Sequence, residues 1–188
     1  LNLFVNGRMH STTNSLSGVT LYGGTSTTKI GILGDLNNTT DFIGHISDLR
    51  IVKGTAVYTA AFTPPTAPLS AISGTSFLAL RGDASIFDAA QINDLTLNGG
   101  VSSSTAQTKN ASSSMYFDGS GDYIAISDLS PLGSGNFTIE FWLYNTNNSG
   151  SQNVFDTRTG STGYTVNIST GGQLGFYSEI ASGYAVQS

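Results

Sequence analysis

The stretch from Asp41 to Leu69 constrains the fold more than any other part of the chain, because a long strand pattern leads into a rigid exit. Apolar or small residues first alternate with polar ones, and the alternation then shifts by one residue. The residues that follow this pattern are Phe42, Gly44, Ile46, Leu49 and Ile51. Because a strand repeats every two residues, such a shift indicates one inserted residue. We therefore predict a strand with a β-bulge near Ser47 and Asp48.

The second part of this stretch does not continue the strand. Alternation ends after Lys53 and Gly54, and residues 55–62 predict an irregular or single-turn helical piece. Three prolines follow, at positions 64, 65 and 68. Proline has no backbone N–H and a fixed φ, so these residues predict a stiff extended segment outside any sheet interior. A last core strand followed by a rigid exit is typical of the end of a folding unit.

Composition favours many short strands and excludes several classes of function. Of the 188 residues, 38% are hydrophobic and 10% charged, and 23 are glycine, which suits turn-rich β-structure. The net charge is −5 and the seven Lys and Arg are scattered, so we expect no nucleic-acid partner. No apolar run approaches the ~18 residues of a membrane span. The absence of cysteine excludes disulfides and thiolate metal sites.

Other segments give clear strand and turn signals. Asn6-Gly7 predicts a type I′ hairpin turn, because both central residues of that turn need a positive φ. The sequence around Asp118-Gly-Ser-Gly-Asp122 predicts a turn between two strands, and residues 102–114 predict a low-complexity polar loop. The cleanest alternation runs from Phe137 to Tyr144, with apolar residues at the odd positions.

Three of these segments carry a resemblance to a known family. FIGHISDLRIV, followed by GTAVYTAAFTPPTAPL at residues 54–69, resembles the C-terminal signature of the laminin-G-like jelly roll of the concanavalin A-like lectin/glucanase type. SMYFDGSGDYIAI and FTIEFWLY resemble the early strands of the same family. The resemblance is greatest to the versions found in virion proteins of marine bacteriophages. It implies an all-β, antiparallel, two-sheet jelly-roll sandwich.

The family's segments occur here in reversed order, which predicts the domain organisation. Residues 1–72 are expected to form the C-terminal part of one laminin-G-like module with its proline-rich exit, and residues 73–188 the N-terminal part of the following module. Half a sandwich leaves strand edges without partners. Either the two parts close on each other as a permuted module, or flanking sequence or a neighbouring chain completes each of them.

We expect no enzymatic activity, although related glucanases carry carboxylates on one strand. A retaining glycosidase needs two carboxyl groups ~5–5.5 Å apart, which neighbouring positions on a strand face provide. Glu140 has Thr138 and Trp142 as its same-face neighbours. The second glutamate, Glu179, lies between Tyr177 and Ala181 on its own face. The required carboxylate pair is therefore absent.

A calcium ion is a candidate cofactor. Asp118 and Asp122 bracket a tight turn, and hard oxygen ligands on such a loop suit Ca²⁺. Asp48, beside the expected bulge, would be a further ligand if the two parts of the chain meet. The alternative is that the two loop aspartates serve the turn itself, since Asp and Gly favour turns for conformational reasons.

Glycan binding is the other candidate chemistry. Trp142 and Tyr144 share the polar parity of their strand, and Tyr177 and Tyr184 are further candidates for stacking on sugar rings. The alternative is that this parity faces the second sheet, in which case these aromatic residues belong to the core.

Together these features favour a structural or adhesive role. We expect a module of a phage virion appendage or surface fibre, located on the virion surface or outside the cell, that binds host-surface glycans and assembles with copies of itself or with other surface proteins. The alternatives are a bacterial secreted or cell-surface lectin or adhesin, and a carbohydrate-binding module of a glycan-degrading enzyme. The phage origin follows from the resemblance alone.

Overall fold

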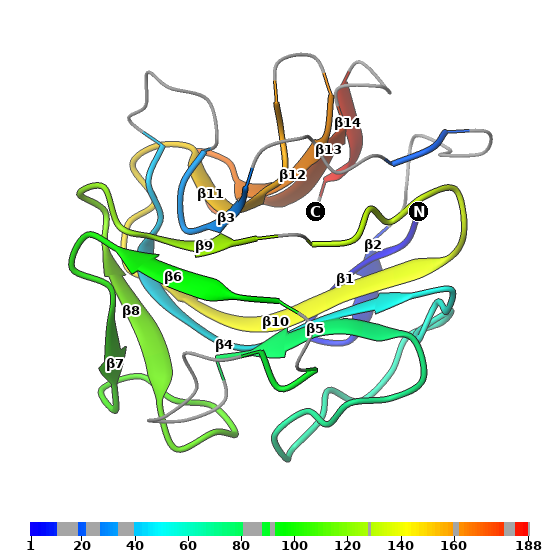
Figure 1. Cartoon of the computed structure of the whole chain (residues 1–188), viewed down its shortest axis with the longest axis horizontal. Coiled ribbons are helices and arrows are strands. Elements are labelled where there is room, and N and C mark those ends of the chain that lie inside the picture. Colours follow the sequence, from blue (N-terminus) through cyan, green and yellow to red (C-terminus); the bar gives the residue numbers. More distant parts are fainter. Residues whose placement is uncertain are drawn as a thin grey trace.

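The computed structural model describes residues 1–10, 19–21, 27–33, 40–80, 88–90, 93–127, 129–159 and 162–178, and the backbone of residues 183–187. Every regular element within these residues is a β-strand (Figure 1). The strand pairs in the two large sheets and in the small hairpin are antiparallel. The prediction of an all-β, antiparallel two-sheet fold is confirmed. The described part of the chain contains no helix that could cross a membrane.

The five-stranded sheet is built around β4 (Ile43–Lys53), the longest strand. β4 pairs along one edge with β10 (Phe137–Asn145). Along its other edge it pairs first with β8 (Ser114–Asp118) and then with β5 (Thr75–Ala79). β8 pairs in turn with β7 (Ser102–Ser104). β4 therefore pairs directly with three of the four other strands, and β7 joins the sheet through β8.

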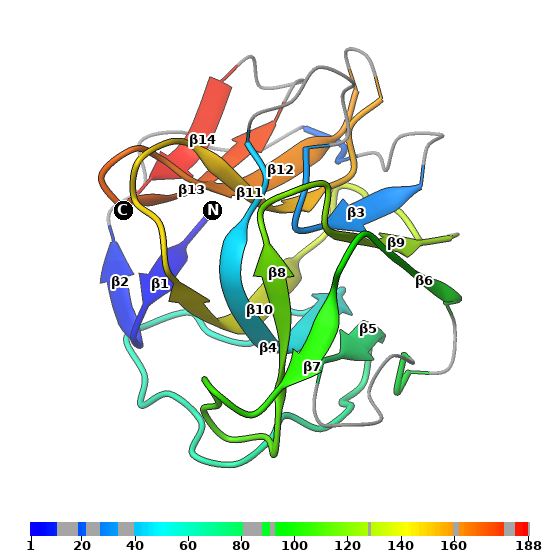
Figure 2. The same ribbon diagram turned by 90° about the vertical axis from the view of Figure 1, so that its left-hand side faces the viewer.

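The seven-stranded sheet packs against this one, and Figure 2 shows the two layers from the side. Its strands in spatial order are β14 (Gly183–Gln187), β13 (Leu174–Ser178), β12 (Tyr164–Ile168), β11 (Gln152–Asp156), β3 (Thr28–Ile30), β9 (Tyr123–Ile126) and β6 (Leu95–Asn98). A separate hairpin consists of β1 (Leu3–Val5) and β2 (Arg8–His10).

The core lies between the two sheets, and most strands contribute alternate residues to it; β11, whose register shifts between Asn153 and Phe155, contributes two consecutive ones. The five-stranded sheet contributes Ile46, Leu49, Ile51, Phe77, Met115 and Phe117, and the seven-stranded sheet contributes Ile30, Ile124, Ile126, Val154, Phe155, Val166 and Phe176. Phe42 meets Phe117 edge to face, with ring centroids 5.8 Å apart. Residues of each strand that do not enter this core face outward, because successive side chains point to opposite faces of a sheet.

The two parts of the chain close on each other. β4, from the first 72 residues, lies between β10 and β8, and β3 lies between β11 and β9. Both sheets therefore need strands from both parts. Of the arrangements left open by the sequence, the structure shows the one in which the parts complete a single sandwich. The assignment of residues 1–72 and 73–188 to successive modules stays a prediction.

The predicted bulge in β4 is confirmed. Glu140 of β10 pairs with Arg50, whereas Trp142 pairs with Ser47, so β4 holds one extra residue at this point. Asp48 sits at the bulge with φ 52°, in a left-handed conformation that Asp tolerates better than most residues. Its N–H donates to the Leu80 carbonyl at 2.9 Å. The bulge thus falls where the partner of β4 changes from β8 to β5.

Two further predictions have different outcomes. The hairpin turn is confirmed, with Asn6 at φ 51° and Gly7 at φ 75°. The loop predicted over residues 102–114 is wrong at both ends, where Ser102–Ser104 forms β7 and Ser114 begins β8. The edge of β8 supplies backbone partners for β7, and this backbone pairing overrides the weak strand preference of a serine run.

Candidate functional site

The outer face of the five-stranded sheet, which points away from the seven-stranded sheet, carries Trp142 and Tyr144. The odd-numbered residues of β10, namely Phe137, Ile139, Phe141 and Leu143, pack against the core. The even-numbered residues therefore face outward. Tyr144 is 50% exposed, and Trp142 is half-buried on the same face. The interpretation of these two residues as part of the core between the sheets does not hold.

An aromatic row crosses three adjacent strands on this face. Tyr144 of β10 pairs with His45 of β4, which pairs with Tyr116 of β8. The His45 ring lies 5.0 Å from the Tyr116 ring and 6.2 Å from the Tyr144 ring, between centroids. We call these three residues and Trp142 the open half of the outer face. His45 and Tyr116 were not among the residues predicted for glycan binding, although the alternation in FIGHISDL and SMYFD places each on the face opposite its apolar neighbours.

His45 is the buried centre of this row. It is 7% exposed, and its Nδ1 shares a hydrogen bond of 3.0 Å with the Ser114 hydroxyl. Burial lowers the pKa of His45 below its ordinary value of 6.5, because a charged imidazolium loses hydration there. The ring is therefore neutral at pH 7 and holds the two tyrosines at a fixed spacing.

Trp142 lies next to this row and is the single tryptophan of the chain. The Lys109 ammonium sits over its indole ring, 5.2 Å from the centroid, in a cation–π contact. Lys109 comes from the segment between β7 and β8, which folds over this part of the sheet and is held there by Asn110, whose amide donates to the Pro65 carbonyl at 2.9 Å.

The other part of the same face is occupied by a buried ion pair. Arg50 Nε donates to Glu140 Oε1 at 2.7 Å, and Arg50 Nη1 donates to the Ser70 carbonyl at 2.6 Å. The Tyr58 hydroxyl donates to Glu140 Oε2 at 3.0 Å. These contacts fasten the proline-rich segment onto the sheet, and we call Arg50, Glu140 and Tyr58 the covered half.

Burial and the neighbouring carboxylate change the properties of Tyr58. Desolvation and then the charge of Glu140 raise the pKa of the Tyr58 hydroxyl to about 12. Both Glu140 oxygens are engaged, one by Arg50 and one by Tyr58. Glu179, the other glutamate considered for catalysis, lies outside the described residues.

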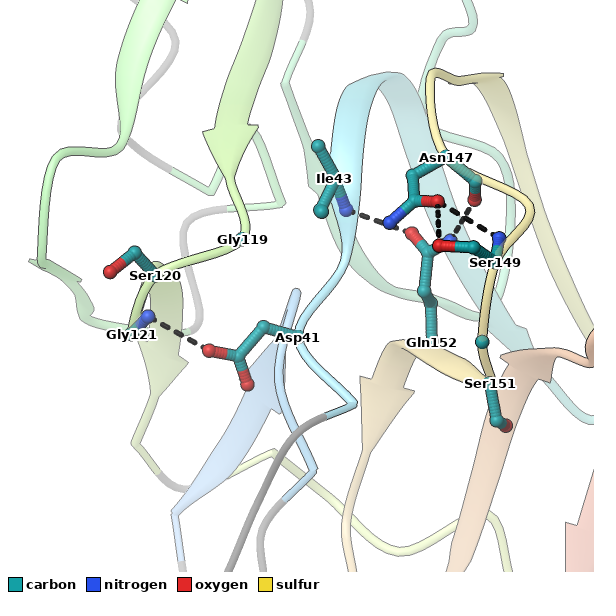
Figure 3. Close-up of a pocket in the computed structure, with 10 residues that line it drawn as sticks. Asp41, Ile43, Gly119, Ser120, Gly121, Asn147, Ser149, Ser151 and Gln152 are labelled. Carbon is teal, nitrogen blue, oxygen red and sulfur yellow. Dashed lines mark hydrogen bonds between the residues drawn. The ribbon is translucent and has the colours of Figure 1, made fainter.

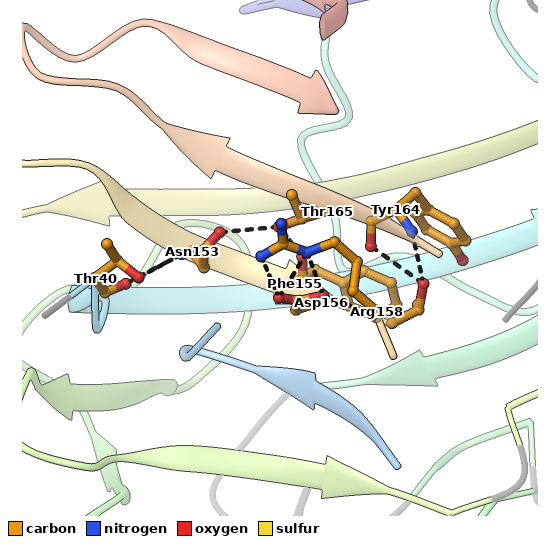
Figure 4. Close-up of polar contacts among 8 residues, drawn as sticks. Thr40, Asn153, Phe155, Asp156, Arg158, Tyr164 and Thr165 are labelled. Atoms are coloured by element: carbon orange, nitrogen blue, oxygen red, sulfur yellow. Dashed lines mark hydrogen bonds and ion pairs between the residues drawn. The ribbon is translucent and has the colours of Figure 1, made fainter. Parts of the chain in front are cut away.

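Tyr177 lies on the other sheet and does not join the aromatic row. It belongs to β13, where its neighbour Phe176 enters the core. The Arg158 guanidinium lies over the Tyr177 ring, 5.8 Å from its centroid. Arg158 also pairs with the buried Asp156 at 3.0 Å (Figure 4). Tyr184 pairs with Tyr177 along the backbone, and its side chain lies outside the described residues.

Asp122 serves the turn that it borders. It is fully buried, its Oδ1 accepts the Gly100 N–H, and its Oδ2 accepts the Asp118 N–H at 2.8 Å. Asp118 Oδ1 accepts the Ser120 N–H at 2.8 Å. A carboxylate with both oxygens engaged by backbone amides is a turn support with little capacity left for a cation.

Asp48 is not brought to these two aspartates. Asp118 pairs with Ile43, and Asp48 is five residues further along β4, roughly 16 Å away at about 3.3 Å per residue. Asp48 Oδ1 instead accepts the Leu69 N–H at 3.1 Å. Among the described residues, no cluster of three or more His, Asp or Glu could hold a metal ion. The three aspartates therefore do not fit a shared calcium site.

Comparison with known proteins gives one family. Residues 118–188 match a family model described as the concanavalin A-like lectin/glucanases superfamily. The matched part is less than half of the chain and contains β9 to β14. No curated protein and no solved structure matches the chain. The matched family and the two-sheet sandwich support a carbohydrate-binding or adhesion-type module.

Proposed function

We propose that this chain is an adhesion module of a phage virion appendage or surface fibre, and that it binds host-surface glycans on the open half of the outer face. One observation carries the proposal. Tyr144 is 50% exposed on a sheet face, beside His45, Tyr116 and Trp142. Large aromatic rings held at fixed spacing on a surface are typical of a recognition site, because they offer apolar area at low entropic cost.

The chemistry of the open half suits the faces of sugar rings. A pyranose presents C–H groups on one face and hydroxyls around its rim. Tyr144 and Tyr116 offer ring faces for the first and phenolic hydroxyls for the second. His45 is buried between them, so its role in this proposal is to set their spacing.

The proposed module binds glycans without cleaving them. Glycoside hydrolysis needs two carboxyl groups beside the scissile bond. On the outer face, Glu140 is committed to Arg50 and Tyr58. The Asp41–Leu69 stretch resembles phage virion proteins. This resemblance supports the proposed location on a virion, outside the cell, and the proposed assembly with copies of itself.

A glycan-binding assay with a matched pair of variants tests the site. Tyr144→Ala should weaken binding at least tenfold on an array of host-surface glycans and in titration calorimetry with the best ligand. Met9→Ala is the control, because Met9 is 51% exposed and lies on the separate β1–β2 hairpin. Equal affinities of the two variants, or no glycan binding by the wild type, would refute the proposed site.

The virion setting needs a separate test. Antibodies raised against this chain should label purified phage particles in electron microscopy, at an appendage or on the capsid surface. Labelling confined to bacterial cells would instead favour the bacterial adhesin.

A further inference from the structure

A polar pocket opens at the end of the five-stranded sheet, next to the open half. It has a volume of about 430 Å³ and is lined by three segments: the entry to β4, the β8–β9 turn and the β10–β11 loop. Figure 3 shows Asp41 and Gly121 on one side, Asn147, Ser149 and Gln152 on the other, and Ile43 between them. Its size falls within the ~300–1,000 Å³ of small-ligand sites.

The walls of the pocket are braced from within. Gln152 Oε1 accepts the Ile43 N–H at 2.9 Å, and Gln152 Nε2 donates to the Asn147 carbonyl, so one side chain ties the β10–β11 loop to β4. The Gly121 N–H donates to Asp41 Oδ2 at 2.8 Å and ties the β8–β9 turn to the same strand. A braced pocket binds with less loss of conformational entropy than a mobile one.

Several polar groups of the lining have no hydrogen-bond partner among the described residues. Asn147 Oδ1 accepts the Ser149 N–H and hydroxyl, while Asn147 Nδ2 makes no hydrogen bond within this part of the chain. The hydroxyls of Ser120 and Ser151 make none there either. Asp41 Oδ1 is buried and accepts no hydrogen bond from the residues that the structure describes. The Asn147 amide and the two serine hydroxyls therefore remain available to pair with hydroxyls of a ligand.

The charge of the lining selects among polar ligands. Asp41 is the one charged residue of the pocket lining in the described part of the chain, so an anionic group meets a like charge there. A hard divalent cation prefers six to eight oxygen ligands and usually more than one carboxylate. Serine hydroxyls, an amide and a single carboxylate are instead suited to a neutral ligand rich in hydroxyls.

The pocket is continuous with the aromatic row. His45 and Tyr144 pair across β4 and β10, and the next pair toward the pocket is Gly44 with Asn145. Ile43, one residue further on, already lines the pocket, and its carbonyl accepts the Thr146 N–H at 3.1 Å. A glycan stacked on Tyr144 therefore reaches the pocket with its next sugar.

The geometry points to a pocket for the terminal sugar of the glycan, and to a neutral sugar: a pyranose with free vicinal hydroxyls and without a carboxylate or sulfate. This inference rests on the proposed function, because Tyr144 is taken to hold the preceding sugar. It adds the class of glycan, which the aromatic row alone does not select.

Two variants test the pocket without disturbing the aromatic row. Gly150 lines the pocket and does not need a positive φ, and a Cβ added to it would meet open space. Gly150→Leu therefore adds a bulky side chain to the pocket lining without backbone strain. Gly135 has the same open space and lies outside the lining, so Gly135→Leu is its control. Asp41→Asn keeps an acceptor for the Gly121 N–H and removes the charge.

Affinities are measured for two forms of the best array oligosaccharide, one with a neutral terminal hexose and one with a terminal uronic acid. The wild type should prefer the neutral form at least tenfold. Gly150→Leu should lose at least tenfold in affinity for it, Gly135→Leu less than twofold, and Asp41→Asn should reduce the preference severalfold.

The outcomes separate this inference from the proposed function. If Tyr144→Ala weakens binding while Gly150→Leu and Gly135→Leu bind alike, the pocket inference is refuted and the proposed function stands. A wild-type preference for the acidic form, or an unchanged preference in Asp41→Asn, also refutes the pocket inference. If the wild type binds neither form nor any other glycan, both proposals fail.

Discussion

The covered half and the open half both include residues of β4 and β10, yet they use their side chains in opposite ways. In the covered half, Arg50 and Glu140 bind each other, and Tyr58 and the Ser70 carbonyl complete the network. In the open half, Tyr144 is 50% exposed, and Trp142 is half-buried beneath the Lys109 ammonium. One half therefore uses its polar groups for internal stability, and the other keeps its aromatic groups available to a partner.

The bulge at Asp48 marks the boundary between the halves. On one side of it β4 pairs with β8, and on the other side with β5. The Asp48 carboxylate accepts the Leu69 N–H, so the bulge also anchors the end of the proline-rich segment. Under the proposed function, stability and recognition are thus separated along one strand pair. Variants in the covered half should change stability, and variants in the open half should change binding.

The largest effect is expected from breaking the ion pair of the covered half. Arg50→Met leaves Glu140 without its cation in a site where the Arg50 and Glu140 side chains are 7% and 14% exposed. Removing one partner of a buried pair lowers stability by about 3–5 kcal/mol. Urea unfolding monitored by circular dichroism measures this change.

The control for this variant lies on the same strand. Lys53 makes an exposed hydrogen bond to the Ser130 hydroxyl at 2.8 Å, so Lys53→Met should change stability by less than about 1 kcal/mol. If Arg50→Met also loses less than about 1 kcal/mol, the covered half is not the stabilising half and the contrast between the halves fails.

A smaller loss is expected from Tyr58→Phe, which removes a hydrogen bond to a carboxylate worth about 1.5–3 kcal/mol. The loss should depend on pH. Tyr58 has a pKa of about 12 in the folded chain and an ordinary value of 10.0, so the neutral hydroxyl is favoured by folding. Its contribution is complete below pH 10 and is lost as the pH rises from 10 to 12.

The measurement is the difference in unfolding free energy between wild type and Tyr58→Phe at several alkaline pH values. Taking the difference removes the contribution of other tyrosines, such as Tyr164, whose pKa burial also raises. This difference in unfolding free energy, or gap, should become smaller as the pH rises from 10 to 12. A gap that stays constant would show that folding does not raise the pKa of Tyr58.

Local patterns in the sequence predicted the elements that determine this comparison. The shifted alternation around Asp48 indicated the bulge, Asn6-Gly7 indicated the hairpin, and the parity of β10 placed Phe137 and Tyr144 on opposite faces. Each of these features depends on residues close together in the chain. A period of two and a turn preference are sufficient to find them.

The pairing of distant segments was beyond the sequence. Tyr177 has the same local pattern as Tyr144 but lies on the other sheet, because β13 pairs with β12 and β14. His45 on β4 and Tyr116 on β8 are far apart in the sequence. They are neighbours only because of the register in which the two strands pair. The proline-rich segment covers one part of the outer face. The composition of this segment does not indicate which part it covers.

The candidate metal residues show the same limit. Asp122 looks like a ligand in the sequence, yet the distant Gly100 N–H and the nearby Asp118 N–H occupy its oxygens. Asp41, which no sequence pattern selected, lines the pocket because it lies at the entry to β4, the strand that pairs with β8. A ligand set depends on long-range pairing as much as on residue type.

In the open half, the stabilising contribution of His45 should be lost at acidic pH. Burial lowers the pKa of His45 below 6.5, so the contribution of the neutral ring to stability is complete above pH 6.5 and is lost as the pH falls toward its folded-state value. His45→Gln removes this titration. The stability difference between wild type and His45→Gln should therefore shrink as the pH falls below 6.5, as measured by urea unfolding.

The smallest effect on stability is expected from Lys109→Met, which removes the cation–π contact with Trp142. An exposed contact of this kind contributes about 0.5–1 kcal/mol. Because Trp142 is the single tryptophan, its fluorescence emission should shift in this variant although stability barely changes.

Lys29→Met is the control, since Lys29 lies over Tyr123 at 5.1 Å on the other sheet. Its removal should leave the Trp142 emission unchanged. A loss of more than about 2 kcal/mol in Lys109→Met would mean that the open half also carries stability, and the division between the halves would then have to be abandoned.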